Sequence, residues 1–238
     1  MNIRLSFSYV ITFLLLLIVM LEFHESVHIV VGRFICGCWG TRDFNAWSLC
    51  DGCDKRHSFS WIATLAGPLF SFGLMWLGMA WLSSANSKKK ALGFSLIFSN
   101  IPFGRISQVM MGSGDEMTVM RSVFKNNFSD AQMILICSVI VLGLGLPPII
   151  KAFRTLTNRL SWLYILGFLA VPLLFLLIYI LTFLNFFLNK GFLSATWIMG
   201  TPLLITLHTG IALIFLILFR KSLFSINRTE MPNALQKV

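Results

Sequence analysis

Two histidines and a glutamate near the N-terminus form the clearest chemical pattern in the chain, in the run His24-Glu25-Ser26-Val27-His28. On an α-helix, residues four apart lie on one face about one turn from each other, so both imidazoles can bind a single Zn²⁺. Glu25 then flanks the open position of the metal, where a carboxylate can act as general base. The HExxH motif predicts a zinc hydrolase. The alternative is a chance match, whose polar groups only hydrogen-bond inside a helix bundle.

A hydrolytic zinc site keeps three protein ligands, so this motif leaves one to find. Asp115 is the preferred candidate, because neighbouring glycines in the run 112–116 let the backbone approach a metal closely. The alternative for Asp115 is an ordinary solvated acid. Glu22 and His208 are rivals. Glu22 lies about 200° around the helix from His24 and should point away, whereas a histidine in an apolar segment often bonds between helices.

The composition places these residues in a membrane protein. Of 238 residues, 57% are hydrophobic and 12% are charged, which is more apolar surface than one soluble core can bury. The lipid bilayer is therefore an expected partner. The net charge of +10 comes from basic residues that fall mostly between apolar runs, as topology-setting charges do. No soluble segment is long enough for a nucleic-acid-binding face, so we expect no nucleic acid partner.

Apolar runs of about 20 residues predict membrane-spanning helices. Five such runs cover residues 7–31, 59–82, 131–150, 160–188 and 195–219. A sixth run, 91–111, is interrupted by Asn100, Pro102, Gly104 and Arg105. Non-helical backbone at that depth is tolerated only beside protein or a water-filled cavity, so the break is a candidate wall of the site. The predicted fold is an all-α polytopic membrane protein with about six transmembrane helices, the third interrupted.

The predicted organisation has three parts. Residues 1–130 form a catalytic membrane core of three spans, with a cysteine-rich loop at 33–58 and an Asp115-bearing loop at 104–130. Residues 131–220 form three further transmembrane helices. Residues 221–238 form a short polar tail.

The distribution of basic residues predicts the orientation. Six spans place both termini on one face, and cytoplasmic loops are enriched in Lys and Arg. The terminal face would carry eleven of them: Arg4, Lys88, Lys89, Lys90, Lys151, Arg154, Arg159, Arg220, Lys221, Arg228 and Lys237. The other face would carry eight: Arg33, Arg42, Lys55, Arg56, Arg105, Arg121, Lys125 and Lys190. We therefore expect cytoplasmic termini, with the cysteine loop and Asp115 facing outward.

Four of the five cysteines, Cys36, Cys38, Cys50 and Cys53, occur as a CxC and a CxxC pair in one loop. Facing the cytosol, reduced thiolates in this pattern could form a structural Cys₄ zinc site. Facing an oxidising exterior, they would form two disulfides. Either arrangement makes the loop a stiff cap beside the HExxH helix. Cys137, in an apolar run, is expected to be a buried small hydrophobe.

Three elements in order resemble the site-2 protease family of intramembrane zinc metalloproteases. The HExxH run is followed by Ala66-Gly67-Pro68-Leu69, which is similar to that family's Ala-Gly-Pro-Leu element, and by Asn100-Ile101-Pro102-Phe103 ahead of Ser113-Gly114-Asp115. The resemblance covers about residues 8–120. It implies that Asp115 is the third zinc ligand and that Asn100 lies near the substrate backbone or the oxyanion. The chain departs from the family pattern at Glu116, where the family usually has glycine.

The resulting hypothesis is an enzyme that hydrolyses peptide bonds in or near transmembrane segments of a membrane-protein or peptide substrate. A zinc-activated water would attack, with Glu25 as general base. The rival is a non-catalytic zinc-binding membrane protein, either a metal-ion transporter or an inactive homologue that binds membrane segments. Replacing Glu25 by Gln separates these hypotheses.

Overall fold

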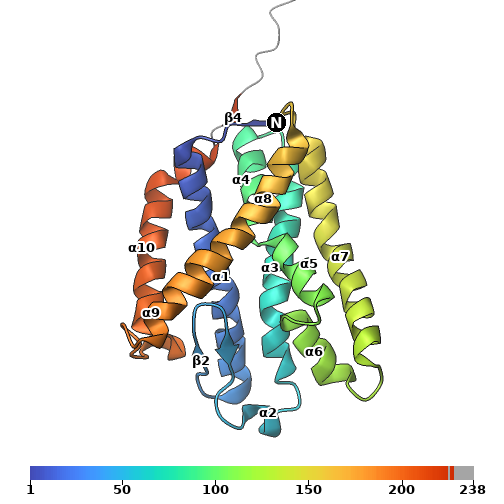
Figure 1. Cartoon of the computed structure of the whole chain (residues 1–238), viewed down its shortest axis with the longest axis vertical. Helices are drawn as coiled ribbons and strands as arrows, with labels where there is room; N and C mark the ends of the chain where they lie inside the picture. The colour runs from blue at the N-terminus through green and yellow to red at the C-terminus, as the bar shows by residue number, and fades with distance from the viewer. Residues whose placement is uncertain (225, 228–238) are drawn as a thin grey trace, which may run out of the picture.

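The computed structural model describes residues 1–224, 226 and 227, and most of them are helical (Figure 1). Five helical segments are long and apolar enough to cross a membrane: α1 (Phe7–Cys36), α3 (Trp61–Leu82), α7 (Asp130–Thr155), the continuous segment Ser161–Asn189 and the segment Leu203–Phe224. This confirms an all-α architecture with several apolar helices of membrane-spanning length.

The remaining elements are shorter. The helical ones are α2 (Cys53–Arg56), α4 (Ser87–Ser99), α5 (Pro102–Met110), α6 (Asp115–Phe124), α8 (Ser161–Phe175), the π-helical η1 (Leu176–Leu184), α9 (Asn185–Asn189), η2 (Ile198–Gly200), α10 (Leu203–Phe219) and η3 (Arg220–Phe224). The strands are β1 (Asn2–Ile3), β2 (Thr41–Arg42), β3 (Trp47–Ser48) and β4 (Ile226–Asn227). No strand was predicted from the sequence.

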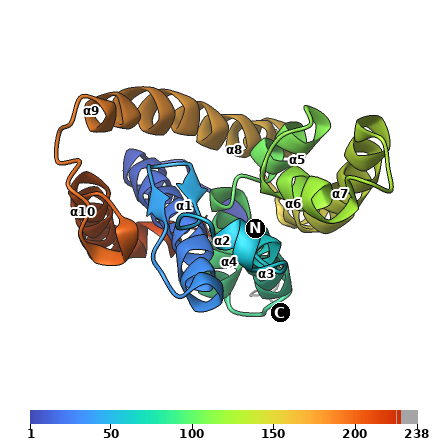
Figure 2. The ribbon, with the colours of Figure 1, turned by 90° about the horizontal axis from the view of Figure 1, so that it is seen from below.

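Helix α1 is the central element. The side chain of Ser6 caps its first turn by accepting a hydrogen bond from the Tyr9 amide, and Gly37 ends it in the left-handed conformation with φ 74°. The helix therefore extends five residues beyond the predicted end at residue 31. It packs against α3, α4 and α10, and Figure 2 shows it between α10 and α3. This central position buries His24, Glu25 and His28 inside the protein.

Helices α3 and α4 pack through a pair of glycines. A Cβ on Gly78 would lie 2.6 Å from the carbonyl oxygen of Gly93, and a Cβ on Gly93 would lie 2.5 Å from that of Gly78. Small residues that let two backbones meet are typical of helix packing in membranes. Aromatic rings of Phe94, Phe98 and Phe168 then join α4 to α8 near the terminal end. These contacts fix α3 and α4 against α1.

The predicted interruption after residue 99 lies between α4 and α5. Helix α4 ends at Ser99, and Ile101 adopts the left-handed conformation with φ 49°, which is costly for a β-branched residue. Pro102 occupies the first turn of α5, where its missing N–H needs no helical partner. The turn reorients the chain, and α5 then packs against α7 and α8. Strained backbone of this kind persists where surrounding structure enforces it.

Two predicted boundaries are wrong. The segment 104–130, expected as a loop, contains most of α5 and all of α6, and Asp115 is the first residue of α6. The last span, expected from residue 195, begins only at Leu203, because Gly200 has φ 69° and Pro202 precedes the helix. Residues 221–224 of the predicted tail belong to η3 (Arg220–Phe224). The rest of the tail lies outside the described residues except for 226 and 227.

The two ends of the described chain meet. Strand β1 pairs antiparallel with β4, with Asn2 opposite Asn227 and Ile3 opposite Ile226. Figure 1 shows this pair at one end of the bundle, while β2, α2 and α6 lie at the other end. The cysteine loop and Asp115 therefore lie at the end opposite the termini.

Candidate metal centre

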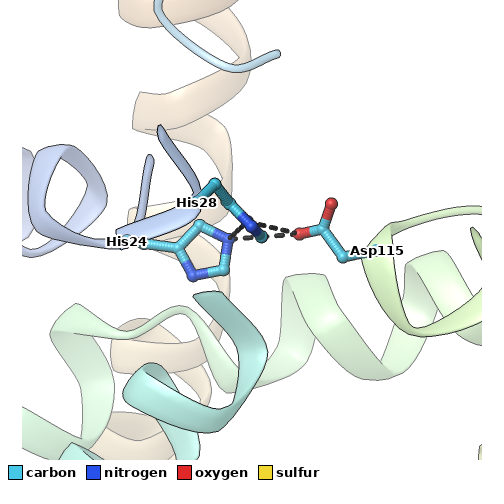
Figure 3. A group of neighbouring side chains, drawn as sticks. All are labelled: His24, His28 and Asp115. Carbon is cyan, nitrogen blue, oxygen red and sulfur yellow. Dashed lines mark hydrogen bonds and ion pairs between the residues drawn. The ribbon is translucent and has the colours of Figure 1, made fainter. Parts of the chain in front are cut away.

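The side chains of His24, His28 and Asp115 converge (Figure 3). Both histidines lie on α1, whereas Asp115 lies on α6, 87 residues further along the chain than His28. Asp115 Oδ2 lies 3.1 Å from His24 Nε2 and 3.3 Å from His28 Nε2. The two Nε2 atoms lie 3.0 Å apart. The structure thus brings together the two histidines of the motif and the carboxylate that the sequence favoured as third ligand.

Helix α3 orients both imidazole rings. The Nδ1–H of His28 donates to the carbonyl oxygen of Ala63 at 2.7 Å, which leaves the Nε2 lone pair facing the convergence point. His24 Nδ1 lies 3.0 Å from Ser71 Oγ. His24 and His28 are 4% and 0% exposed, so water does not compete for these bonds. A hydrogen bond on the far ring nitrogen is the usual way in which a protein fixes a metal-binding histidine.

Gly67 lies between these two α3 contacts, one turn from each. A Cβ at this position would lie 2.2 Å from His28 Nε2 and 2.6 Å from His24 Cε1. The absence of a side chain therefore allows α3 to pack directly against the histidine pair. From the sequence alone, Gly67-Pro68 could be only a kink that lets helices pack closely. Because Gly67 lies against the histidine pair, it is also part of the site.

Asp115 begins α6, where an acid complements the helix dipole. Gly112 and Gly114 precede it with φ of 72° and 90°, so the turn that aims its side chain needs glycine. Its Oδ2 atom lies 3.1 Å from His24 Nε2 and 3.3 Å from His28 Nε2, so the carboxyl group faces both imidazoles. The carboxylate is therefore available as an anionic ligand.

The donor set fits a zinc ion. Two imidazole nitrogens and a carboxylate oxygen are common ligands of catalytic zinc. The three donor atoms are 3.0, 3.1 and 3.3 Å apart, close to the ~3.3 Å between neighbouring ligand atoms of a tetrahedral zinc with ~2.05 Å bonds. A fourth position would remain open, which is the mark of a catalytic rather than a structural site.

Glu25 lies directly after the first histidine and is 5% exposed. Its Oε2 atom has no hydrogen-bond partner among the residues that the structure describes. A buried carboxylate oxygen without a partner is costly, and such groups usually have a functional reason. That Glu25 acts as a proton acceptor stays a prediction of the motif, for which the unpaired Oε2 atom would be available.

The segment after α1 forms a hairpin that covers the histidines. Strands β2 and β3 pair through Arg42 and Trp47, and the Trp47 ring stacks on His28 with centroids 4.7 Å apart. Arg42 Nη2 pairs with Glu22 Oε2 at 2.8 Å. Glu22 therefore points to the hairpin and does not join the histidine pair, as its helical position predicts. Sequence reasoning missed Trp47, and its only signal was its place in the cysteine-rich loop.

The four loop cysteines form two disulfides, Cys36–Cys53 and Cys38–Cys50. Of the two arrangements left open by the sequence, the structure has the disulfides rather than a Cys₄ zinc site. They tie the hairpin to the last turn of α1 and to α2. Cys137 is a free, buried cysteine, as expected.

Asn100 lies at the helix break beside the site. It is 5% exposed, its Nδ2 donates to the carbonyl oxygen of Leu96 at 2.7 Å, and its Oδ1 has no partner within residues 1–224. A cavity of about 20 Å³, which is room for about one water molecule, is lined by Asn100 together with His24, Ser71 and Arg105. Asn100 therefore lies beside His24, and its expected position near the substrate backbone or the oxyanion stays a prediction.

Sequence reasoning placed Arg105 in the helix break and among the topology charges, but it predicted no contact of Arg105 with the candidate ligands. Its Nη2 lies 2.8 Å from His24 Nδ1 and 3.1 Å from Ser71 Oγ. Its Nη1 pairs with Glu116 Oε1 at 3.2 Å. Glu116, the departure from the family pattern, is thus the buried partner of an arginine that contacts a candidate ligand.

Two other features lie apart from this centre. His208 on α10 accepts or donates a 3.1 Å hydrogen bond with the Tyr179 hydroxyl, so it is a helix-packing residue rather than a ligand here. A larger apolar cavity of about 300 Å³ lies between the start of α1 and α8, lined by Tyr9, Phe13 and Phe168 among others. Neither feature includes a residue of the histidine cluster.

Comparison of the chain with protein-family models, with curated proteins and with solved structures finds no match in any of the three.

Proposed function

We propose that the chain is an intramembrane zinc metalloprotease, similar in its site to the site-2 protease family, that hydrolyses peptide bonds in or near transmembrane segments of other proteins. The convergence of His24, His28 and Asp115 carries the proposal. Ionisable groups inside apolar helices are expensive and are best explained by function. The buried carboxylate of Glu25, whose Oε2 has no partner among the described residues, follows the first histidine and supports a hydrolytic role for the site.

In this proposal His24, His28 and Asp115 hold the ion. Zinc in such a site lowers the pKa of a bound water to about 7 and so supplies a nucleophile at neutral pH. Glu25 accepts the proton of the attacking water and passes it to the leaving amine. Asn100 lines the same small cavity as His24, where its side-chain amide can orient the substrate backbone.

The substrate must unwind before cleavage, because carbonyl groups in a helix are already hydrogen-bonded and shielded. The helix break at Asn100 and Ile101 and the hairpin edge near Trp47 both border the site. Both supply polar backbone beside the ligands. We propose that a locally extended substrate segment lies between them.

The membrane arrangement in this proposal has six crossings, with the interrupted α4–α5 segment as the third. Five crossings alone would leave the chain ends on opposite faces, whereas β1 and β4 pair at one end. The return path is supplied by α4, α5 and α6. The excess of Lys and Arg on the terminal face favours cytoplasmic termini, and disulfides at the opposite end agree with an oxidising exterior there.

Replacing Glu25 by Gln tests the catalytic proposal. We expect Glu25→Gln to bind zinc as the wild type does and to lose cleavage by at least about 100-fold, because a general base contributes 10²–10⁴-fold. The measurement is cleavage of a panel of single-span membrane substrates in proteoliposomes, with zinc content determined on the same samples.

The control is Asp115→Ala, which should lose both zinc and cleavage because it removes a ligand. Unchanged zinc in Asp115→Ala would remove that residue from the site. A wild type that binds zinc and transports it, with transport unaffected in Glu25→Gln, would favour the metal-ion transporter. Zinc binding without cleavage or transport would favour an inactive homologue that binds membrane segments.

A further inference from the structure

The guanidinium of Arg105 lies against the ring of a proposed metal ligand. Its Nη2 is 2.8 Å from His24 Nδ1 and 3.4 Å from His24 Nε2. The side chain is only 13% exposed, and its Nε has no hydrogen-bond partner in the described part of the chain. A largely buried cation therefore contacts Nδ1 of the histidine whose Nε2 would bind a second cation.

The hydrogen-bonding capacity of the two groups makes this contact informative. Arginine only donates, so His24 Nδ1 must accept from it, and the single hydrogen of the neutral ring is then on Nε2. That Nε2–H can donate to Asp115 Oδ2, 3.1 Å away. Metal binding through Nε2 instead requires the hydrogen on Nδ1, where it would meet the N–H of Arg105. The arginine contact and metal binding at His24 are mutually exclusive.

The positive charge of Arg105 also opposes metal binding at His24. The guanidinium stays protonated in proteins, so it places a full positive charge beside the ligand atoms. Glu116 balances this charge through Nη1, at 3.2 Å. Because this ion pair uses Nη1, it can persist while Nη2 moves away from His24. Asn100 Oδ1, a buried acceptor without a partner among the described residues, lines the same small cavity as Arg105 and gives Nη2 an alternative acceptor.

We propose that Arg105 competes with the metal ion for His24. It holds the histidine when the ion is absent, and it turns from the ring toward Asn100 when the ion binds. Arg105 is thus a positioning residue that sets the metal affinity of the site. The inference rests on the metal site of the proposed function but does not require that the chain cleaves peptides.

The test is the zinc affinity of two purified variants, measured by competition with a chromophoric chelator. Arg105→Met alone would leave the Glu116 carboxylate buried and unpaired, which endangers folding. The comparison is therefore between Glu116→Gln and the double variant Arg105→Met/Glu116→Gln. We expect the double variant to bind zinc more tightly by about tenfold or more, since even in water a unit charge a few ångströms from a divalent ion has an effect of that size.

Whether the double variant binds zinc more tightly or more weakly decides whether Arg105 competes with the metal ion. Structural damage weakens metal binding, whereas only the removal of a competitor strengthens it. Equal or weaker zinc binding by the double variant would overturn the inference. A chain that binds zinc but cleaves no substrate would refute the protease proposal while the affinity comparison still decides the role of Arg105.

Lys125→Met is the matched control. Lys125 is exposed at the C-terminal end of α6, ten residues along the chain from Asp115. Its replacement removes one positive charge as well, and we expect the zinc affinity to change by less than about threefold because exposed charges are screened. Tightening as large as that between Glu116→Gln and the double variant would show that net charge alone is responsible and would overturn the inference.

Discussion

Gly67 has only a hydrogen where any other residue would place a carbon atom against the two histidines. We expect Gly67→Ala to displace the imidazoles, lower the zinc content to that of the Asp115→Ala variant, and cost about 1–3 kcal/mol of stability through overpacking. Zinc analysis and thermal unfolding of the purified variants would measure both effects. Gly73→Ala on the same helix is the control, because a Cβ there meets nothing within 4 Å. Retained zinc in Gly67→Ala would contradict the close packing.

The individual ligands were predictable because their chemistry is local. An HExxH spacing on a helix puts His24 and His28 on one face whatever surrounds them, and glycines around Asp115 indicate a close backbone turn. The role of Arg105 was not predictable. It depends on the path of α5 after the helix break, which places Nη2 2.8 Å from His24, and no local pattern specifies that path.

At the scale of elements, the hairpin β2–β3 shields the histidine pair through the stacked Trp47 ring. We expect Trp47→Ala to speed the loss of zinc to a chelator by about tenfold or more, as removal of a group that orients a metal-binding histidine does. Trp39→Ala is a matched control, because Trp39 lies on the same loop but packs on Arg33. Equal rates for the two variants would contradict a shielding role for the hairpin.

Elements defined by long apolar runs were predicted well, and elements defined by tertiary contacts were not. The runs of about 20 apolar residues gave α1, α3 and α7, and Asn100 with Pro102 gave the break between α4 and α5. Helix α6 and the two-residue strands escaped prediction. Helix α6 has a mixed sequence whose order comes from packing on α3 and α7, and the hairpin is held by disulfides whose pairing the sequence left open.

For the whole molecule, the six-crossing arrangement predicts which loops face the same side. Ala85, between α3 and α4, and Asn126, after α6, are both exposed and lie at opposite ends of the chain fold. We expect a membrane-impermeant maleimide to label Asn126→Cys in intact cells and Ala85→Cys only after permeabilisation. The native cysteines are disulfide-bonded or buried, so they give little background.

The labelling pattern distinguishes a wrong orientation from a wrong number of membrane crossings. The reverse pattern would place the termini outside and contradict the orientation predicted from the basic residues. Labelling of both positions from the same side would contradict the return path through α4, α5 and α6.

Every residue of the metal centre described above precedes residue 131, because the site is assembled from α1, α3, α5, α6 and the disulfide-linked hairpin. The consequence concerns biosynthesis. Once the ribosome has synthesised residues 1–130, all three candidate ligands are present, so in the proposed function zinc would be able to bind before α7 to α10 are translated. A metal bound at that moment would guide the order in which the later helices assemble around it.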